Sequence, residues 1–324
     1  MVKQKGHVMK AYLGIDAGSV SINFVVIDGA GKVITGLYLR TKGRPIQVIQ
    51  EGLKKTAELI LPDYEVIGVG TTGSGRYLAG VLVGADVVKN EITAHAVAAS
   101  TMVPEVQTVF EIGGQDSKII ILRNGIVTDF AMNTVCAAGT GSFLDQQAAR
   151  LNIPIDKFGA LALQSTVPVR IAGRCTVFAE SDMIHKQQMG HQIPDIINGL
   201  SEALVRNYLN NVGKGKEILP PIVFQGGVAA NVGIKAAFEK ALGKPVIIPK
   251  HFDIMGAIGA AQLAQEEVQN KKTNFKGFEI AGLPYRTSSF ECNGCSNVCE
   301  IVEIYEGDKV IGRWGSRCSK WDIV

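Results

Sequence analysis

The stretch that decides the fold reads YLGIDAGSVSINFVVID over residues 12–28. Its two apolar runs, at 12–16 and 23–28, indicate buried strands, and the polar segment between them indicates a tight turn. Three more elements follow in the prediction: a strand at 33–39, a helix opened by Pro45 that runs to residue 60, and a strand at 66–70.

The same order of elements recurs in VFEIGGQDSKIIIL over residues 109–122. Here too a strand, a polar glycine turn and a second strand lead through a hairpin to a third strand, at 126–132. Sequence identity between the copies is low, so the shared order carries the interpretation. The pattern predicts an internal duplication and two α/β lobes, although two unrelated α/β stretches also fit it.

Later segments continue the α/β pattern. The predicted elements are helices at 141–151, 178–189 and 194–212, a strand at 222–224, a helix at 231–242, a short strand at 245–249 and a helix at 253–270. A composition change near residue 290 marks a tail that holds four of the six cysteines. In this tail we expect a hairpin of strands 300–305 and 310–314.

Composition narrows the classes of function. The 324 residues are 46% hydrophobic and 19% charged, which is typical of a globular protein. Lys and Arg number 33 and Asp and Glu 30, so the net charge of +3 argues against nucleic acid or an anionic membrane as partner. No apolar run reaches the roughly 20 residues that span a bilayer, and no signal peptide is recognisable. We therefore expect a cytoplasmic protein whose cysteines are metal ligands or core residues.

The two polar turns predict phosphate binding, although no GxxxxGK[ST] motif is present. Glycines let the backbone approach phosphate oxygens, and exposed N–H groups donate to them. Asp16 and Asp116 are candidates to hold Mg²⁺. The candidate phosphate contacts are Gly14, Gly18, Ser19, Ser21, Gly113, Gly114 and Lys118, whereas Gly226, Gly227 and Asn231 suit the adenosine side. Gln115 is a neutral amide suited to orienting an attacking water.

Two cysteines precede predicted helices, Cys136 in NTVCAAGTG (133–141) and Cys175 in GRCTVFAESDM (173–183). A helix N-terminus stabilises a thiolate or the negative charge of an iron–sulfur cluster. Two ligands are half of what a [4Fe–4S] cluster needs, and a two-fold dimer supplies four. Buried structural cysteines are the alternative.

Taken together, the turns and glycine runs resemble the actin, hexokinase and Hsp70 superfamily of ATPases. The resemblance implies two duplicated RNase H-like lobes with the nucleotide, ATP or ADP with Mg²⁺, in the cleft between them. It also makes Gly139, Gly141 and Gly256 part of two connecting helices. The implied division is 1–105 for the first lobe, 106–250 for the second and 251–270 for a helix returning to the first. From the composition we expect a linker at 271–287 and a Cys-rich metal-binding tail at 288–324.

The motifs around residues 111–118, 136–145 and 173–183 are similar to those of the activators of 2-hydroxyacyl-CoA dehydratases and the ATPase subunits of benzoyl-CoA reductases. That family implies a homodimer with one [4Fe–4S] cluster bridging Cys136 and Cys175 of both chains. It also implies ATP-driven transfer of single electrons to an iron–sulfur partner enzyme, with ferredoxin or flavodoxin as donor. A small-molecule kinase with structural cysteines and a non-catalytic ATP-binding scaffold are the alternatives.

The tail departs from the short activator pattern. Its cysteines, Cys292, Cys295, Cys299 and Cys318, have spacing suited to one Zn²⁺ or a second iron–sulfur cluster. An activator with such a tail resembles the reductases of double-cubane-cluster proteins.

Overall fold

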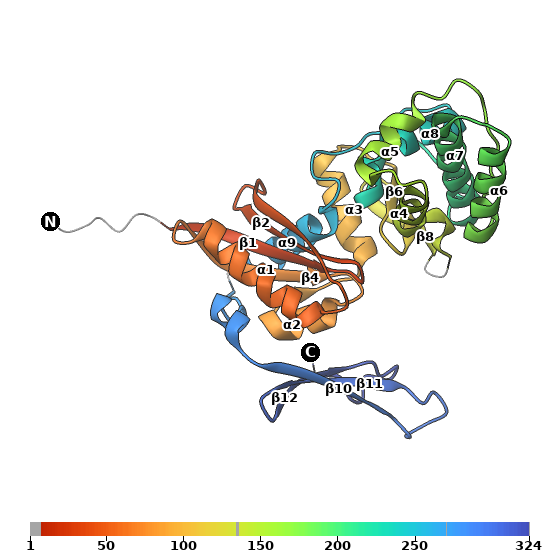
Figure 1. The fold of residues 1–324 in the computed structure, drawn as a ribbon. Coiled ribbons are helices and arrows are strands. Elements are labelled where there is room, and N and C mark those ends of the chain that lie inside the picture. The colour runs from red at the N-terminus through yellow and green to blue at the C-terminus, as the bar shows by residue number, and fades with distance from the viewer. Residues whose placement is uncertain (1–7, 134–135, 270, 324) are drawn as a thin grey trace. The chain divides into compact units, whose positions relative to one another are not determined.

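A computed structural model describes residues 8–133, 136–269 and 271–323 (Figure 1). The chain divides into two compact units. Unit 1 comprises residues 1–98 and 256–324, and unit 2 comprises residues 99–255. No helix among the described residues is both long enough and apolar enough to cross a bilayer.

Unit 1 is built on a five-stranded sheet in the order β3-β2-β1-β4-β5, in which β1 pairs antiparallel with β2 and parallel with β4. The strands are β1 (Met9–Ala17), β2 (Ser21–Asp28), β3 (Val33–Arg40), β4 (Tyr64–Thr72) and β5 (Val87–Val88). Helices α1 (Pro45–Ile60) and α2 (Arg76–Val83) cover one face of the sheet (Figure 1).

Helix α9 (Met255–Val268) packs closely against β1 and β4 through glycines. A Cβ atom on Gly70 would lie 2.0 Å from the Ala260 carbonyl oxygen. A Cβ on Gly259 would likewise lie 1.8 Å from the Ala94 carbonyl oxygen of α3 (Glu91–Met102). Gly70 of β4 and Gly259 of α9 therefore allow the backbones of these elements to pack in close contact.

Unit 2 repeats the sheet with four strands in the order β8-β7-β6-β9. The strands are β6 (Thr108–Ile112), β7 (Ser117–Arg123), β8 (Ile126–Asn133) and β9 (Ile222–Gln225). Again the first strand pairs antiparallel with the second and parallel with the fourth. Because the order and the directions match those of β3-β2-β1-β4, the predicted duplication is confirmed.

The helices of unit 2 are α4 (Gly141–Arg150), α5 (Ile155–Ala162), α6 (Thr176–Gln188), α7 (Ile193–Asn211) and α8 (Val232–Leu242). An aromatic cluster holds α7 and α8 to the sheet. The ring centroids of Phe110 and Phe224 of the sheet lie 4.8 and 5.2 Å from that of Phe238 of α8. The ring centroid of Tyr208 of α7 lies 5.3 Å from that of Phe110. These side chains are almost fully buried, so their burial contributes strongly to the stability of this unit.

Some elements differ from the sequence-based expectation. Helices α2, α3 and α5 were not predicted, because α2 and α5 are only 8 residues long and α3 is Ala-rich with little amphipathic contrast. The expected strand at 245–249 is a single bridge between Ile247 and Val223, since prolines at both ends prevent a longer ladder.

The segment expected to be a linker is anchored on unit 1. Thr273 Oγ1 and the Asn274 N–H both donate to the Asp86 carboxylate, at 2.7 Å. The short η3 helix (Phe278–Gly282) packs on α1, and Gln50 Nε2 donates to the Leu283 carbonyl at 2.7 Å. Residues 271–287 therefore form part of the packed unit.

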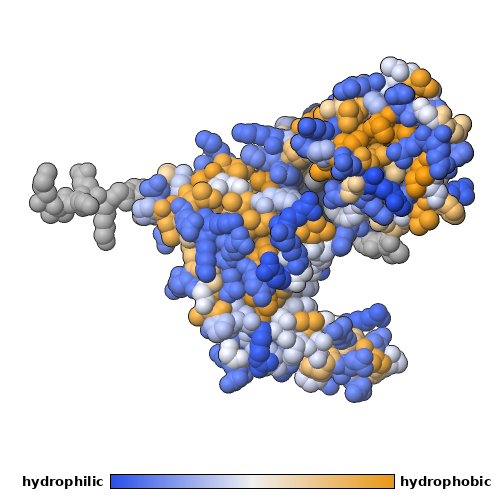
Figure 2. Space-filling view, in the orientation of Figure 1, coloured by the Kyte–Doolittle hydropathy of each residue, from blue (hydrophilic) through white to orange (hydrophobic). Residues whose placement is uncertain are grey.

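The tail contains β10 (Tyr285–Glu291), β11 (Glu300–Glu306) and β12 (Lys309–Trp314), joined antiparallel. The predicted β11–β12 hairpin is confirmed, and β10 is an additional strand. Ile304 is fully buried within the core of unit 1, and a Cβ on Gly312 would lie 2.6 Å from Val81 of α2. The surface of the tail in Figure 2 is mostly of intermediate or polar hydropathy.

Candidate functional site

The first polar turn joins β1 to β2, and the Gly18 N–H donates to the Ser21 carbonyl at 2.9 Å. Asp16 stands at its entrance, half-buried. Its Oδ1 lies 2.5 Å from where a Cβ of Gly73 would be, and its Oδ2 lies 2.2 Å from the corresponding point on Gly256. Both neighbours must therefore be glycine for this carboxylate to keep its place.

The loop after β4 lies against the same turn. The Gly75 N–H donates to the Ala17 carbonyl at 2.7 Å, just before α2 begins. Sequence reasoning assigned this loop no function, although its glycines were the available signal. By contrast Gly14, an expected phosphate contact, is buried in β1, where a Cβ would meet the Ala257 carbonyl of α9 at 1.9 Å.

The second polar turn joins β6 to β7 with the same hydrogen bond, from the Gly113 N–H to the Asp116 carbonyl at 3.0 Å. Gly114 is half-buried and Gln115 is exposed. The turn thus presents its backbone and the Gln115 amide to the outside of unit 2, as a phosphate-binding loop requires.

Lys118 forms a buried ion-pair network. Its Nζ lies 2.8 Å from Glu111 Oε2 and 2.8 Å from Asp116 Oδ2, and the side chains of Lys118 and Glu111 are only 3% and 6% exposed. A buried carboxylate requires such a partner, because an unpaired charge in the interior is costly. Sequence reasoning expected Lys118 to contact phosphate and missed Glu111 as its partner.

Strand register shows which residues of the two turns correspond. Asp16 stands opposite Asn23, and Glu111 stands opposite Lys118, so each pair encloses a turn of the same length. Asp16 therefore corresponds to Glu111, whereas Asp116 corresponds to Ser21. The two aspartates that the sequence placed in parallel roles occupy different positions in the repeat.

The glycine turn after β9 lies beside the end of β6. Gly226 has a φ of +87°, and a Cβ there would meet the Ile112 carbonyl oxygen at 2.4 Å. Asn231 caps α8 by accepting the Ile234 N–H at 3.1 Å, and its Nδ2 has no hydrogen-bond partner within the described chain. Gly227 is exposed.

Helix α4 begins on the second turn. The Gly141 N–H donates to the Gly113 carbonyl and the Ser142 N–H to the Gly114 carbonyl, both at 2.9 Å. Since Gly226 approaches the same strand end, the polar turn, the glycine turn and the start of α4 converge within unit 2.

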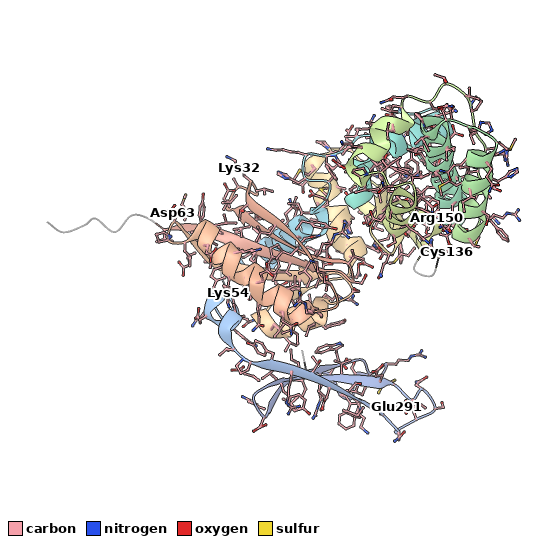
Figure 3. The ribbon with its side chains drawn as sticks, viewed as in Figure 1. Lys32, Lys54, Asp63, Cys136, Arg150 and Glu291 are labelled. Carbon is pink, nitrogen blue, oxygen red and sulfur yellow. The ribbon has the colours of Figure 1, made fainter. Side chains whose placement is uncertain are left out.

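Both candidate cluster cysteines precede helical segments in unit 2. Cys136, labelled in Figure 3, comes directly before the short η1 helix (Ala137–Gly139). The Asn133 side chain accepts the Cys136 N–H at 3.0 Å and donates to its carbonyl at 2.8 Å. Cys175 occupies the N-cap position of α6, and both cysteines are half-buried. The predicted placement of each thiol at a helical start is confirmed.

The tail cysteines lie on two neighbouring loops. The Cys292 N–H donates to the Cys299 carbonyl at 2.8 Å, and Trp321 Nε1 donates to Cys292 Sγ at 3.2 Å. Hydrogen bonds from the Gly294 N–H and Trp321, with the nearby Lys320 charge, lower the pKa of the Cys292 thiol. Cys295 and Cys318 are exposed. Within the described ranges, no three His, Cys, Asp or Glu side chains are gathered as metal ligands.

Comparison with known proteins identifies the family. Residues 13–264 match the model of the BadF/BadG/BcrA/BcrD ATPase family. The chain belongs to this ATPase family. It is 36% identical over 263 residues to the (R)-2-hydroxyglutaryl-CoA dehydratase activating ATPase of Acidaminococcus fermentans, a match that covers 79% of this chain and 97% of the relative.

Solved structures agree with the assignment. The activator of the 2-hydroxyisocaproyl-CoA dehydratase from Clostridium difficile, solved with bound ADPNP, superposes with a TM-score of 0.72 at 30% identity, over 80% of this chain and 96% of that one. The ethanolamine utilization protein EutJ from Carboxydothermus hydrogenoformans shares the fold at 17% identity, with a TM-score of 0.53 over 78% of this chain and 89% of that one. The predicted duplicated ATPase fold and the resemblance to dehydratase activators are confirmed.

Proposed function

We propose that this ATPase is an ATP-dependent reductase that delivers single low-potential electrons to a partner iron–sulfur enzyme of the dehydratase type. The relatives named as dehydratase activators support the partner class. The observation that carries the proposal is the pair of hydrogen bonds from Gly141 and Ser142 to the 113–114 turn. They connect the segment that follows Cys136 to a candidate phosphate loop, so a movement of that loop would be passed to the cysteine segment.

The residues fit a cysteine-ligated cluster. Cys136 and Cys175 each sit where a helical N-terminus favours negative charge, and each is partly accessible. Two thiolates per chain are half a ligand set, so the proposal includes a homodimer that shares one [4Fe–4S] cluster. When bound, such a cluster supplies a one-electron redox centre. A ferredoxin or flavodoxin is the proposed electron donor.

The nucleotide residues are proposed from the turns. Asp16 and Asp116 hold Mg²⁺, and the backbone of Gly18, Ser19, Gly113 and Gly114 binds phosphate oxygens. Ser21, whose carbonyl closes the first turn, supports the same loop. The unpartnered Asn231 Nδ2 supports a role on the adenosine side. Gln115, exposed at the tip of the second turn, orients the attacking water.

Cysteine substitution tests the proposal. Cys136→Ser and Cys175→Ser should each remove the cluster from the dimer and abolish electron delivery. ATP hydrolysis should persist, because neither cysteine belongs to the two candidate phosphate-binding turns. Anaerobic iron and sulfide analysis should find about four fewer irons per dimer in each variant than in the wild type. Ser181→Ala is the matched control, since this hydroxyl of α6 donates to the Val177 carbonyl within its own helix. A colourless wild-type protein that phosphorylates a small molecule would instead support a kinase.

For the tail we propose one metal centre held by Cys292, Cys295, Cys299 and Cys318, with Zn²⁺ or a second iron–sulfur cluster as occupant. The N–H donors on Cys292 Sγ support it, because such bonds stabilise thiolate ligands. Since the pKa of Cys292 is lowered, its thiolate persists at lower pH than that of an ordinary cysteine. After a chelator has removed the metal, its alkylation by iodoacetamide should therefore remain fast at that lower pH.

Metal analysis of full-length protein and of a Cys292→Ser variant tests the tail centre. The Cys292→Ser variant should lose one equivalent of metal per chain. In the wild-type protein, the bound metal should slow the alkylation of all four thiols. Trp321→Phe should shift the alkylation profile of Cys292 to higher pH, because the indole donor is removed. Metal-free protein with four freely alkylated thiols would refute the centre.

A further inference from the structure

One turn of α7 touches both cysteine segments. Asn207, only 4% exposed, donates from Nδ2 to the Gly173 carbonyl at 2.6 Å, two residues before Cys175. Its Oδ1 lies 3.0 Å from where a Cβ of Gly139 would be, three residues after Cys136. A single buried amide therefore lies against the backbones that follow one cysteine and precede the other.

Glycine is required at position 173, on the Cys175 side of this contact. A Cβ on Gly173 would lie 2.8 Å from the carbonyl oxygen of Ala203, one helical turn before Asn207. Arg206 Nη2 also donates to the Ile171 carbonyl at 2.6 Å. The segment before Cys175 is thus held against α7 at two carbonyls, and its approach is as close as a peptide backbone allows.

The same turn of α7 also reaches the strand that follows the second polar turn. The Tyr208 hydroxyl donates to the Lys118 carbonyl at 2.6 Å. Burial raises the pKa of Tyr208 well above its ordinary value, so the hydroxyl stays protonated and keeps donating. Residues 203–208 therefore contact both cysteine segments and β7.

We infer that Asn207 is a positioning residue that fixes the Cys136 and Cys175 segments against one turn of α7, and thereby against the strand of the second phosphate turn. A buried Asn is costly unless its amide is satisfied, and here both ends of the amide are used. Its oxygen accepts Asn211 Nδ2 at 2.9 Å, which fixes the orientation of the group. Its role in holding cluster ligands rests on the proposed function, whereas the joining of the two segments does not.

Hydrogen exchange of the metal-free protein tests the joining directly. The Cys136 N–H is bonded to Asn133 Oδ1 and the Ala172 N–H to Asp182 Oδ2 at 2.8 Å, so each reports on one segment. Asn207→Ala should accelerate exchange of both amides, by about tenfold at Ala172, where the buried hydrogen bond to Gly173 is lost, and by less at Cys136, where the packing against Gly139 is lost. Ser201→Ala is the control, since this buried hydroxyl of α7 bonds only to Ile197 of its own helix.

Two further variants separate the contacts. Asn207→Asp keeps the acceptor near Gly139 but loses the donor to Gly173, so Ala172 should respond far more than Cys136. Asn211→Ala is a milder variant that should give a smaller rise in both segments if Asn207→Ala proves too unstable. Acceleration of only one segment in Asn207→Ala, or an equal rise throughout β6 and β9, would overturn the inference.

Loaded protein supplies a second readout. In Asn207→Ala, iron release to a chelator should be about tenfold faster, and the cluster potential should rise because water reaches the looser segments. Neither should change in Ser201→Ala. If wild-type protein binds no iron, the proposed function fails while the exchange result still decides the role of Asn207. Unchanged iron release and potential alongside accelerated exchange would refute the ligand-holding role.

Discussion

The two polar turns have the same hydrogen bond and the same register, yet they carry different charges. In unit 1 the strand residue before the turn is Asp16, opposite the neutral Asn23. In unit 2 the corresponding residue is Glu111, opposite Lys118 and paired with it at 2.8 Å. Asp16 is half-buried between glycines, whereas Glu111 is deeply buried.

This difference suggests that the carboxylates of the two duplicated turns have different roles, one in catalysis and the other in folding. A deeply buried carboxylate such as Glu111 is neutralised by its lysine within the protein, and the loss of either partner leaves an uncompensated buried charge. A partly accessible carboxylate at the end of a strand, beside a polar turn, is suited to holding a cation such as Mg²⁺. We therefore expect catalysis to depend on Asp16 and folding of unit 2 to depend on Glu111 and Lys118.

The largest effect is expected at Asp16. Asp16→Ala should lower the rate of Mg-ATP hydrolysis by about a thousandfold, because a metal ligand that offsets charge developing in phosphoryl transfer is lost. Steady-state ATPase assays over a range of Mg²⁺ concentrations would measure it. Asp63→Ala is the control, since this exposed carboxylate lies at the other end of β1 (Figure 3). Normal turnover in Asp16→Ala would show that the two turns do not divide their roles in this way.

A somewhat smaller effect, on stability, is expected at Lys118. Lys118→Met should lower the free energy of unfolding by about 3 kcal/mol, because Glu111 is left buried without its cation. Chemical denaturation followed by circular dichroism measures this. The double variant Glu111→Leu with Lys118→Met should recover most of the loss. Lys216→Met, which breaks the exposed pair with Asp129, should cost less than about 1 kcal/mol.

The smallest effect is expected at the tip of the second turn. Gln115 corresponds by register to Val20, so Gln115→Val makes the second turn resemble the first. Because orientation of water matters only toward the transition state, kcat should fall about tenfold while ATP affinity stays unchanged. Single-turnover kinetics with a separate binding measurement distinguishes the two. A change confined to affinity would assign Gln115 to binding.

Much of the fold could be predicted from the sequence. The long apolar strands around both turns, the hairpins and α1 have clear periodicity or turn residues, and the repeat of their order predicts the duplication. The short helices could not be predicted in this way, since α3 is Ala-rich with little amphipathic contrast. The packed 271–287 segment was read as a linker because its contacts, such as Asp86 with Thr273, join residues distant in sequence.

The candidate site was predicted in part. Local motifs place Asp16, Cys136 and Cys175 at strand or helix ends, and the structure has them there. The pairing of Lys118 with Glu111 follows from cross-strand register, which a motif does not show. Asn207 had no signal at all, because it is one polar residue in a long amphipathic helix and acts through backbones far away in the sequence.

The anchoring of residues 271–324 has a practical consequence for anyone shortening this protein. The family match ends at residue 264, which suggests an obvious place to truncate. A cut there would remove the hydrogen bonds of Thr273 and Asn274 to the Asp86 carboxylate. It would also remove β12, which packs against the Val81 side chain at Gly312. It would also expose apolar surface that Ile280 and Ile304 now bury. A fragment ending at the family boundary would thus be an aggregation-prone protein rather than a minimal version of this ATPase.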